Sequence, residues 1–152
     1  MGLVPWWITH WKFQPAPLNL APLRWLGAIP LLVGIAILLD SFARFALQGL
    51  GTPAPVLPTK HLVITGLYRY VRNPMYVGVV AAICGQALLF ESKYLLIYGT
   101  LVWLAVHLFV RFYEEPTLRR TFGDEYAAFC REVPRWIPRL KRAHIREASD
   151  GL

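Results

Sequence analysis

Three long apolar blocks, separated by polar and proline-rich stretches, dominate the hydrophobic pattern of the chain. They cover residues 25–47, 74–90 and 94–113. Because a helix needs about 20 residues to cross a hydrocarbon core of about 30 Å, each block predicts a membrane-spanning helix, the second slightly short. The polar turn Glu91–Lys93 separates the last two blocks, so we expect them to form a helical hairpin across the bilayer.

Shorter elements are expected on either side of these blocks. Residues 1–24 combine tryptophans with prolines, a composition that favours an interfacial segment over a long helix. Towards the other end, Tyr126, Phe129 and Val133 recur at helical spacing. This pattern predicts a short amphipathic helix that begins near Asp124.

Composition and charge also indicate a membrane protein. Hydrophobic residues make up 56% of the chain and charged residues 16%, against roughly 25% charged in soluble domains. The net charge of +7 suits either nucleic acid or an anionic membrane, and the apolar blocks favour the membrane. We predict an all-α integral membrane helical bundle without a nucleic-acid partner. It is expected to form one domain over 1–152, with about three transmembrane helices, a cytosolic amphipathic helix and a frayed tail over 141–152.

The basic residues predict the orientation of this bundle. The stretch 48–74 holds three Lys or Arg residues and the tail 111–152 holds nine, whereas the Glu91–Lys93 turn holds one. By the positive-inside rule, the stretch and the tail share the cytosolic face of an inner membrane.

Several residues near that face predict local geometry. Asn73 can cap the second helix, Pro74 suits its first position, and Gly66 can turn the chain ahead of it. Asp40 and Arg44 stand at the i,i+4 spacing of an ion pair.

Small residues recur along the second predicted helix at three- and four-residue spacing. This pattern is typical of a face that packs closely against another membrane helix. The residues are Gly78, Ala81, Ala82 and Gly85.

The hairpin brings the start of the second helix and the end of the third to the same membrane face. On a helix, Arg111 lies three and four residues from Glu114 and Glu115, so all three can share one face. Pro116 disfavours helical geometry at Glu115, so we expect the helix to bend or stop at the two carboxylates. Spacing alone permits two interpretations of these residues: a solvated charge cluster, or a pocket for a charged ligand.

Two stretches around the hairpin resemble motifs of the isoprenylcysteine carboxyl methyltransferase family, a group that also includes membrane phospholipid methyltransferases. Residues 66–78 match the pattern G-x-Y-x-x-x-R-H-P-x-Y-x-G, with Asn73 in place of the histidine. Residues 114–126 match E-E-x-x-L-x-x-x-F-G-x-x-Y, followed by Val133-Pro134. The resemblance covers about residues 55–140.

The resemblance implies a membrane methyltransferase that uses S-adenosylmethionine, with a cofactor-binding core over 60–140 and a lipophilic or lipid methyl acceptor. It implies that Arg111 faces the acceptor. An amine acceptor would need a base, for which Glu114 or a tyrosine is the candidate; a carboxylate or thiol acceptor is the alternative. Neither cysteine belongs to a metal-ligating cluster, so no metal site is predicted. The residues expected to line the cofactor site are Lys60, His61, Leu62, Val63, Tyr68, Asn73, Pro74, Met75, Tyr76 and Glu115.

Two other functions are compatible with the residues. The chain could be a non-enzymatic membrane accessory protein whose basic cytosolic tail binds lipid or a partner. It could also be a sterol-type membrane reductase, which would bind a nicotinamide cofactor.

Overall fold

The computed structural model describes residues 2–10, 23–47 and 64–139. The predicted cofactor residues 60–63 and the predicted frayed tail 141–152 lie outside these ranges. The described elements are helical: α1 (Leu3–Thr9), η1 (Leu23–Gly27), α2 (Ala28–Leu47), η2 (Gly66–Arg69), α3 (Pro74–Leu89), α4 (Lys93–Phe109), η3 (Val110–Glu114) and α5 (Glu115–Glu132).

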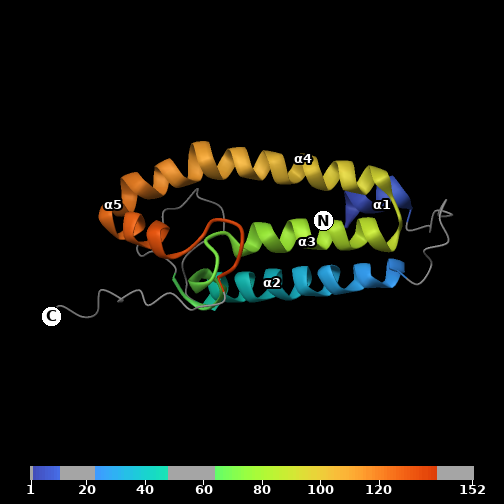
Figure 1. Cartoon of the computed structure of the whole chain (residues 1–152), viewed down its shortest axis with the longest axis horizontal. Helices are drawn as coiled ribbons and strands as arrows, with labels where there is room; N and C mark the ends of the chain where they lie inside the picture. The colour runs from blue at the N-terminus through green and yellow to red at the C-terminus, as the bar shows by residue number, and fades with distance from the viewer. Residues whose placement is uncertain (1, 11–22, 48–63, 140–152) are drawn as a thin grey trace.

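The three long helices α2, α3 and α4 lie side by side, with α3 between the other two (Figure 1). The short helix α1 lies beside α4, at the end where α3 turns into α4. At the opposite end, α5 folds back towards the start of α3 and the end of α2. The architecture is therefore all-α, as predicted, and both motifs lie at one end of the helices.

The apolar blocks form helices close to their predicted boundaries. Within the described residues, the helices Arg24–Arg44 and Lys93–Glu132 are long and apolar enough to cross a membrane by length and composition. The helix α3 has 16 residues, which span about 24 Å, and is shorter than a full upright crossing. Large apolar side chains such as Ile29, Leu32 and Leu101 are exposed on the outer helices, as expected for surfaces that face lipid.

The helices α2 and α3 approach each other closely along the predicted face of small residues. A Cβ atom added to Gly34 would lie 2.6 Å from the carbonyl oxygen of Gly78, and one added to Gly85 would lie 2.5 Å from the backbone nitrogen of Leu31. Ala82 is buried in the same contact. The small-residue prediction is confirmed, because only hydrogen atoms fit between the two backbones at these glycines.

This contact predicts that Gly34→Ala destabilises the bundle. The added methyl group overlaps the backbone of α3, and overpacking of this kind costs about 1–3 kcal/mol. Thermal unfolding of the detergent-purified protein measures the effect as a lower Tm. Gly2→Ala is the matched control, since nothing lies within 4 Å of a Cβ at that position. An unchanged Tm for Gly34→Ala would contradict the close α2–α3 packing.

The third long helix does not stop at the carboxylate pair, so of the two outcomes expected from Pro116, a bend or a stop, the stop is wrong. It passes through the π turn η3, where the Glu115 N–H donates to the carbonyl of Val110, and continues as α5. A proline lacks the N–H that would bond to the preceding turn, and the wider π turn absorbs this loss without ending the helix.

The amphipathic helix predicted near Asp124 is the second half of α5. Gly123 interrupts α5 with a positive φ of 50°, so the chain changes direction there and starts a new helical stretch. Tyr126, Phe129 and Val133 are buried together, as the spacing predicted. This small core holds the C-terminal segment against the rest of the motif end.

Candidate functional site

The structure brings the two motifs into direct contact. The Tyr76 hydroxyl donates to Oε2 of Glu114 at 3.2 Å. Nη1 of Arg72 donates to Oε1 of Glu115 at 3.0 Å. These bonds join the start of α3 to the start of α5, so the prediction that the hairpin brings these two segments together is confirmed.

Glu115 is the most heavily bonded side chain of this region. Its carboxylate is 5% exposed and accepts a bidentate pair from Arg135, Nε to Oε1 at 2.6 Å and Nη2 to Oε2 at 2.8 Å. Arg72 supplies a third bond to Oε1. The hydrogen bond to Glu115 raises the pKa of the Arg135 guanidinium above its ordinary value. One buried carboxylate therefore links α3, α5 and the segment after α5.

The segment that follows α5, residues 133–139, lies along the first motif. The Arg72 N–H donates to the carbonyl of Pro134 at 2.9 Å, and the Arg139 N–H donates to the carbonyl of Tyr70 at 2.9 Å. Through these two backbone bonds the segment crosses the chain just ahead of α3, like a short strap. We call residues 133–139 the C-terminal strap.

Asn73 occupies the N-cap position of α3, but its side chain forms no capping hydrogen bond. Its Nδ2 instead donates to the carbonyl of Arg135 at 3.3 Å. The expected side-chain cap is therefore wrong, because the strap offers Asn73 a tertiary acceptor. Pro74 stands at the first helical position, as predicted, and is buried.

Glu114 has different surroundings from its neighbour. Burial raises the pKa of the Glu114 carboxyl, the hydrogen bond from Tyr76 opposes this shift, and the charge of Glu115 adds to it. No basic side chain in the described residues forms an ion pair with Glu114. Tyr68 lies close enough that burial, and then the charge of Glu114, raise the pKa of Tyr68 to about 12. Glu114, Tyr68 and Tyr76 thus form a carboxylate–phenol group in which Glu114 has no ion pair with a cation of the described residues.

Arg111 is not brought to the carboxylate pair. Its side chain is exposed, whereas Glu115 is buried and takes its ion pairs from Arg72 and Arg135. The π turn η3 changes the register of the residues between Arg111 and Glu115, so they do not share a face as they would on a regular helix. The acceptor-facing role of Arg111 stays a prediction.

Two residues that contact this site were not predicted from the sequence. Arg135 is central to it, and the only local signal was its place directly after the Val133-Pro134 step that ends the second motif. The second is Cys130, whose Sγ accepts a hydrogen bond from Nη1 of Arg72 at 2.9 Å. Met75 is half-buried beside these groups on α3.

The bonds of Glu115 predict that Glu115→Gln loosens the C-terminal strap. The substitution leaves Arg72 and Arg135 without their charged partner, and breaking a buried pair in this way costs about 3 kcal/mol. Hydrogen–deuterium exchange should show faster exchange over residues 133–139. Glu132→Gln, at an exposed position of α5, serves as the control. Equal protection of the strap in both variants would show that Glu115 does not hold it.

The chain was compared with known families and with curated proteins. It matches the family model described as phospholipid methyltransferase over residues 23–125. It is similar to a phosphatidylethanolamine N-methyltransferase of Laccaria bicolor, with 38% identity over 85 residues, which are 54% of this chain and 9% of that protein. A protein-S-isoprenylcysteine O-methyltransferase of Schizosaccharomyces pombe is 36% identical over 80 residues, 51% of this chain and 34% of that protein.

A third relative gives a similar result. A phosphatidylethanolamine N-methyltransferase of Zygosaccharomyces rouxii is 32% identical over 69 residues, 45% of this chain and 8% of that protein. The chain thus covers from 8% to 34% of the length of these relatives. No solved structure matches it. The family match takes in α2, α3, α4 and the carboxylate pair, and it ends before Cys130 and Arg135.

Proposed function

Because the chain belongs to the phospholipid methyltransferase family, we propose that it transfers a methyl group from S-adenosylmethionine to a lipid acceptor. The observation that carries this proposal is the Glu114–Tyr76 pair at the motif end of the membrane helices. We place this end at the cytosolic face of an inner membrane, on the basis of the basic residues around it.

The charge of the described site residues is complementary to that of the cofactor. S-adenosylmethionine supplies an electrophilic methyl group on a positively charged sulfur, and it also carries an ammonium group. Glu114 is a partly buried carboxylate with a raised pKa and no cationic partner in the described residues, so a bound cation would favour its ionised form. The rings of Tyr68 and Tyr76 can face such a cation.

The neighbouring residues would hold this pocket in shape. Glu115 was predicted to contact the cofactor, and its bonds to Arg72 and Arg135 support a role in fixing the pocket wall. We propose that residues 60–63, together with Asn73–Tyr76, complete the lining.

The acceptor would be aligned rather than strongly activated. A carboxylate or thiolate acceptor needs only to be held at near-attack distance from the methyl carbon. An amine acceptor must also lose a proton, and Glu114 can accept it at a carboxylate oxygen that the Tyr76 hydroxyl orients. We propose that Arg111, exposed beside this site, contacts the polar part of the acceptor.

The proposal is tested by following radiolabelled methyl transfer from S-adenosylmethionine into lipid extracted from membranes that contain the protein. Glu114→Gln should lower the rate by about 10²–10⁴-fold, because the amide neither carries the negative charge nor accepts the proton. Glu125→Gln, an exposed carboxylate on α5, should retain the wild-type rate. Thermal unfolding shows whether an inactive variant is still folded, and calorimetry measures whether the wild type binds S-adenosylhomocysteine. A folded wild type that binds no cofactor would favour the accessory-protein hypothesis.

The raised pKa of Glu114 also predicts a pH dependence of cofactor affinity. A cation binds the ionised carboxylate, so affinity for S-adenosylmethionine should fall as the pH drops through the Glu114 pKa. Because that pKa is raised, the loss begins at higher pH than for an ordinary glutamate. Calorimetric titration over the acidic range should show this loss in the wild type and a flat profile in Glu114→Gln. A flat wild-type profile would contradict a direct contact between Glu114 and the cation.

A further inference from the structure

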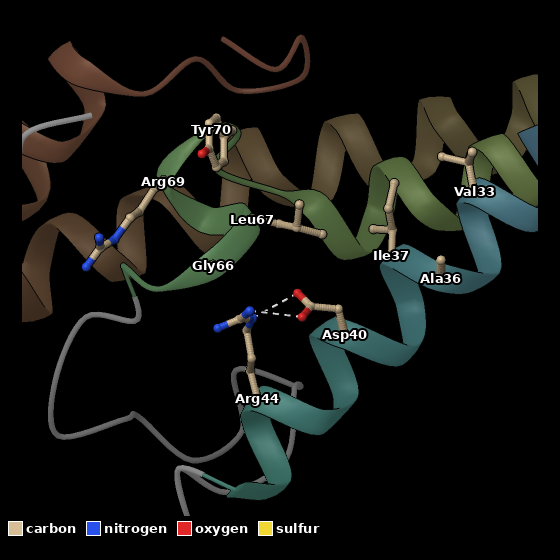
Figure 2. Close-up of a pocket in the computed structure, with 9 residues that line it drawn as sticks. All are labelled: Val33, Ala36, Ile37, Asp40, Arg44, Gly66, Leu67, Arg69 and Tyr70. Atoms are coloured by element: carbon tan, nitrogen blue, oxygen red, sulfur yellow. Dashed lines mark hydrogen bonds and ion pairs between the residues drawn. The ribbon is translucent and has the colours of Figure 1, made fainter. Parts of the chain in front are cut away.

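A cavity of about 520 Å³ lies between α2 and η2, apart from the Glu114–Tyr76 pair (Figure 2). Its apolar wall is formed by Val33, Ala36 and Ile37 of α2, with Leu67 of η2 opposite them. Because α2 is an outer helix of the three-helix layer and is long enough to span a membrane, this wall lies within reach of lipid chains (Figure 1).

The other end of the cavity is charged. Asp40 and Arg44 follow the apolar residues along the same face of α2, and Arg69 contributes from η2. The lining residues of α2 from Val33 to Arg44 cover about 16 Å of helix. The cavity therefore changes from apolar to charged in the direction of the motif end, as does a lipid from acyl chain to headgroup.

Arg44 has hydrogen-bonding capacity that its ion pair does not use. Its Nε and Nη2 donate to the two oxygens of Asp40 at 2.8 Å and 2.9 Å, as the i,i+4 spacing predicted. Its Nη1 has no partner in the described residues, and the side chains of Arg44 and Asp40 are 32% and 35% exposed. Asp40 thus fixes the guanidinium and leaves its Nη1 edge without a partner in the described part of the chain.

The turn at Gly66 is shaped around this guanidinium. Gly66 has a positive φ of 56°, and a Cβ added there would lie 2.0 Å from Cζ of Arg44. A side chain at this position would push the guanidinium away from the cavity. The glycine of the first motif therefore serves two purposes here: it permits the turn and it makes room for Arg44.

We propose that the cavity between α2 and η2 binds a glycerophospholipid, with its phosphodiester on Arg44 and one acyl chain along Val33, Ala36 and Ile37. An arginine edge is well suited to a phosphate, and the apolar wall excludes a small hydrophilic anion as the whole ligand. The further step, that this lipid is the methyl acceptor, rests on the proposed function. Tyr68, adjacent to the lining residue Leu67, lies near both Asp40 and Glu114, since the charges of both carboxylates raise the pKa of its phenol.

The binding is tested by native mass spectrometry of the detergent-purified protein, without cofactor. The probes are dioctanoyl phosphatidylethanolamine, dioctanoylglycerol, which lacks the phosphate, and glycerol phosphate, which lacks the chains. The double variant Asp40→Asn/Arg44→Gln removes both charges and leaves neither partner unpaired. It should weaken phospholipid binding about tenfold or more and leave dioctanoylglycerol binding unchanged. Val33→Trp should weaken both, because the indole fills the apolar end. Arg131→Gln, an exposed arginine of α5, is the control.

Each result decides between the alternatives. Wild-type phospholipid binding in the double variant, or in Val33→Trp, would overturn the site. Glycerol phosphate that binds as tightly as the phospholipid would also overturn it, since the site would then hold free phosphate esters. A wild type that binds the phospholipid but transfers no methyl group would refute the proposed function alone and leave the lipid site in place.

Discussion

The motif end of this protein depends on the buried carboxylate of Glu115 and the two arginines that share it. Arg72 reaches it from the turn before α3, and Arg135 reaches it from the strap that follows α5. A carboxylate this buried is tolerated only when it is paired and fully hydrogen-bonded. The three segments are therefore held as a unit, and the strap is fixed along the first motif by the same contact. The geometry of the candidate site follows from this unit.

The same constraint explains why two adjacent glutamates have different properties. Glu115 takes both arginines, so the described residues offer Glu114 only the hydroxyl of Tyr76. A carboxylate that is desolvated and lacks a cation has a raised pKa, and the binding of a positively charged ligand would relieve this cost. Glu114 is thus available to bind a ligand or accept a proton, because Glu115 forms the ion pairs that hold the segments together.

The fold was largely predictable, because membrane helices are specified by local pattern. The apolar blocks gave helix boundaries near Ala28–Leu47 and Pro74–Leu89, and the recurrence of small residues gave the α2–α3 contact. The site was less predictable. Asn73 and Arg135 owe their roles to the strap, which joins residues far apart in sequence, and no local rule indicates such a partner. The spacing argument that put Arg111 on one face with Glu114 and Glu115 assumed a regular α-helix, and the π turn η3 alters that register.

The glycine contacts of the bundle bear directly on the chemistry at its end. Because Gly34 and Gly78 let α2 and α3 approach to backbone distance, the end of α2 comes near η2 across the cavity between them. This approach buries Ser41 beside Tyr68 and seats Arg44 against Gly66. A bulkier interface would separate α2 from the first motif, and with it the charged end of the cavity from the Glu114–Tyr76 pair. Close helix packing in the membrane is thus a condition for joining a lipid-facing groove to a polar site at the surface.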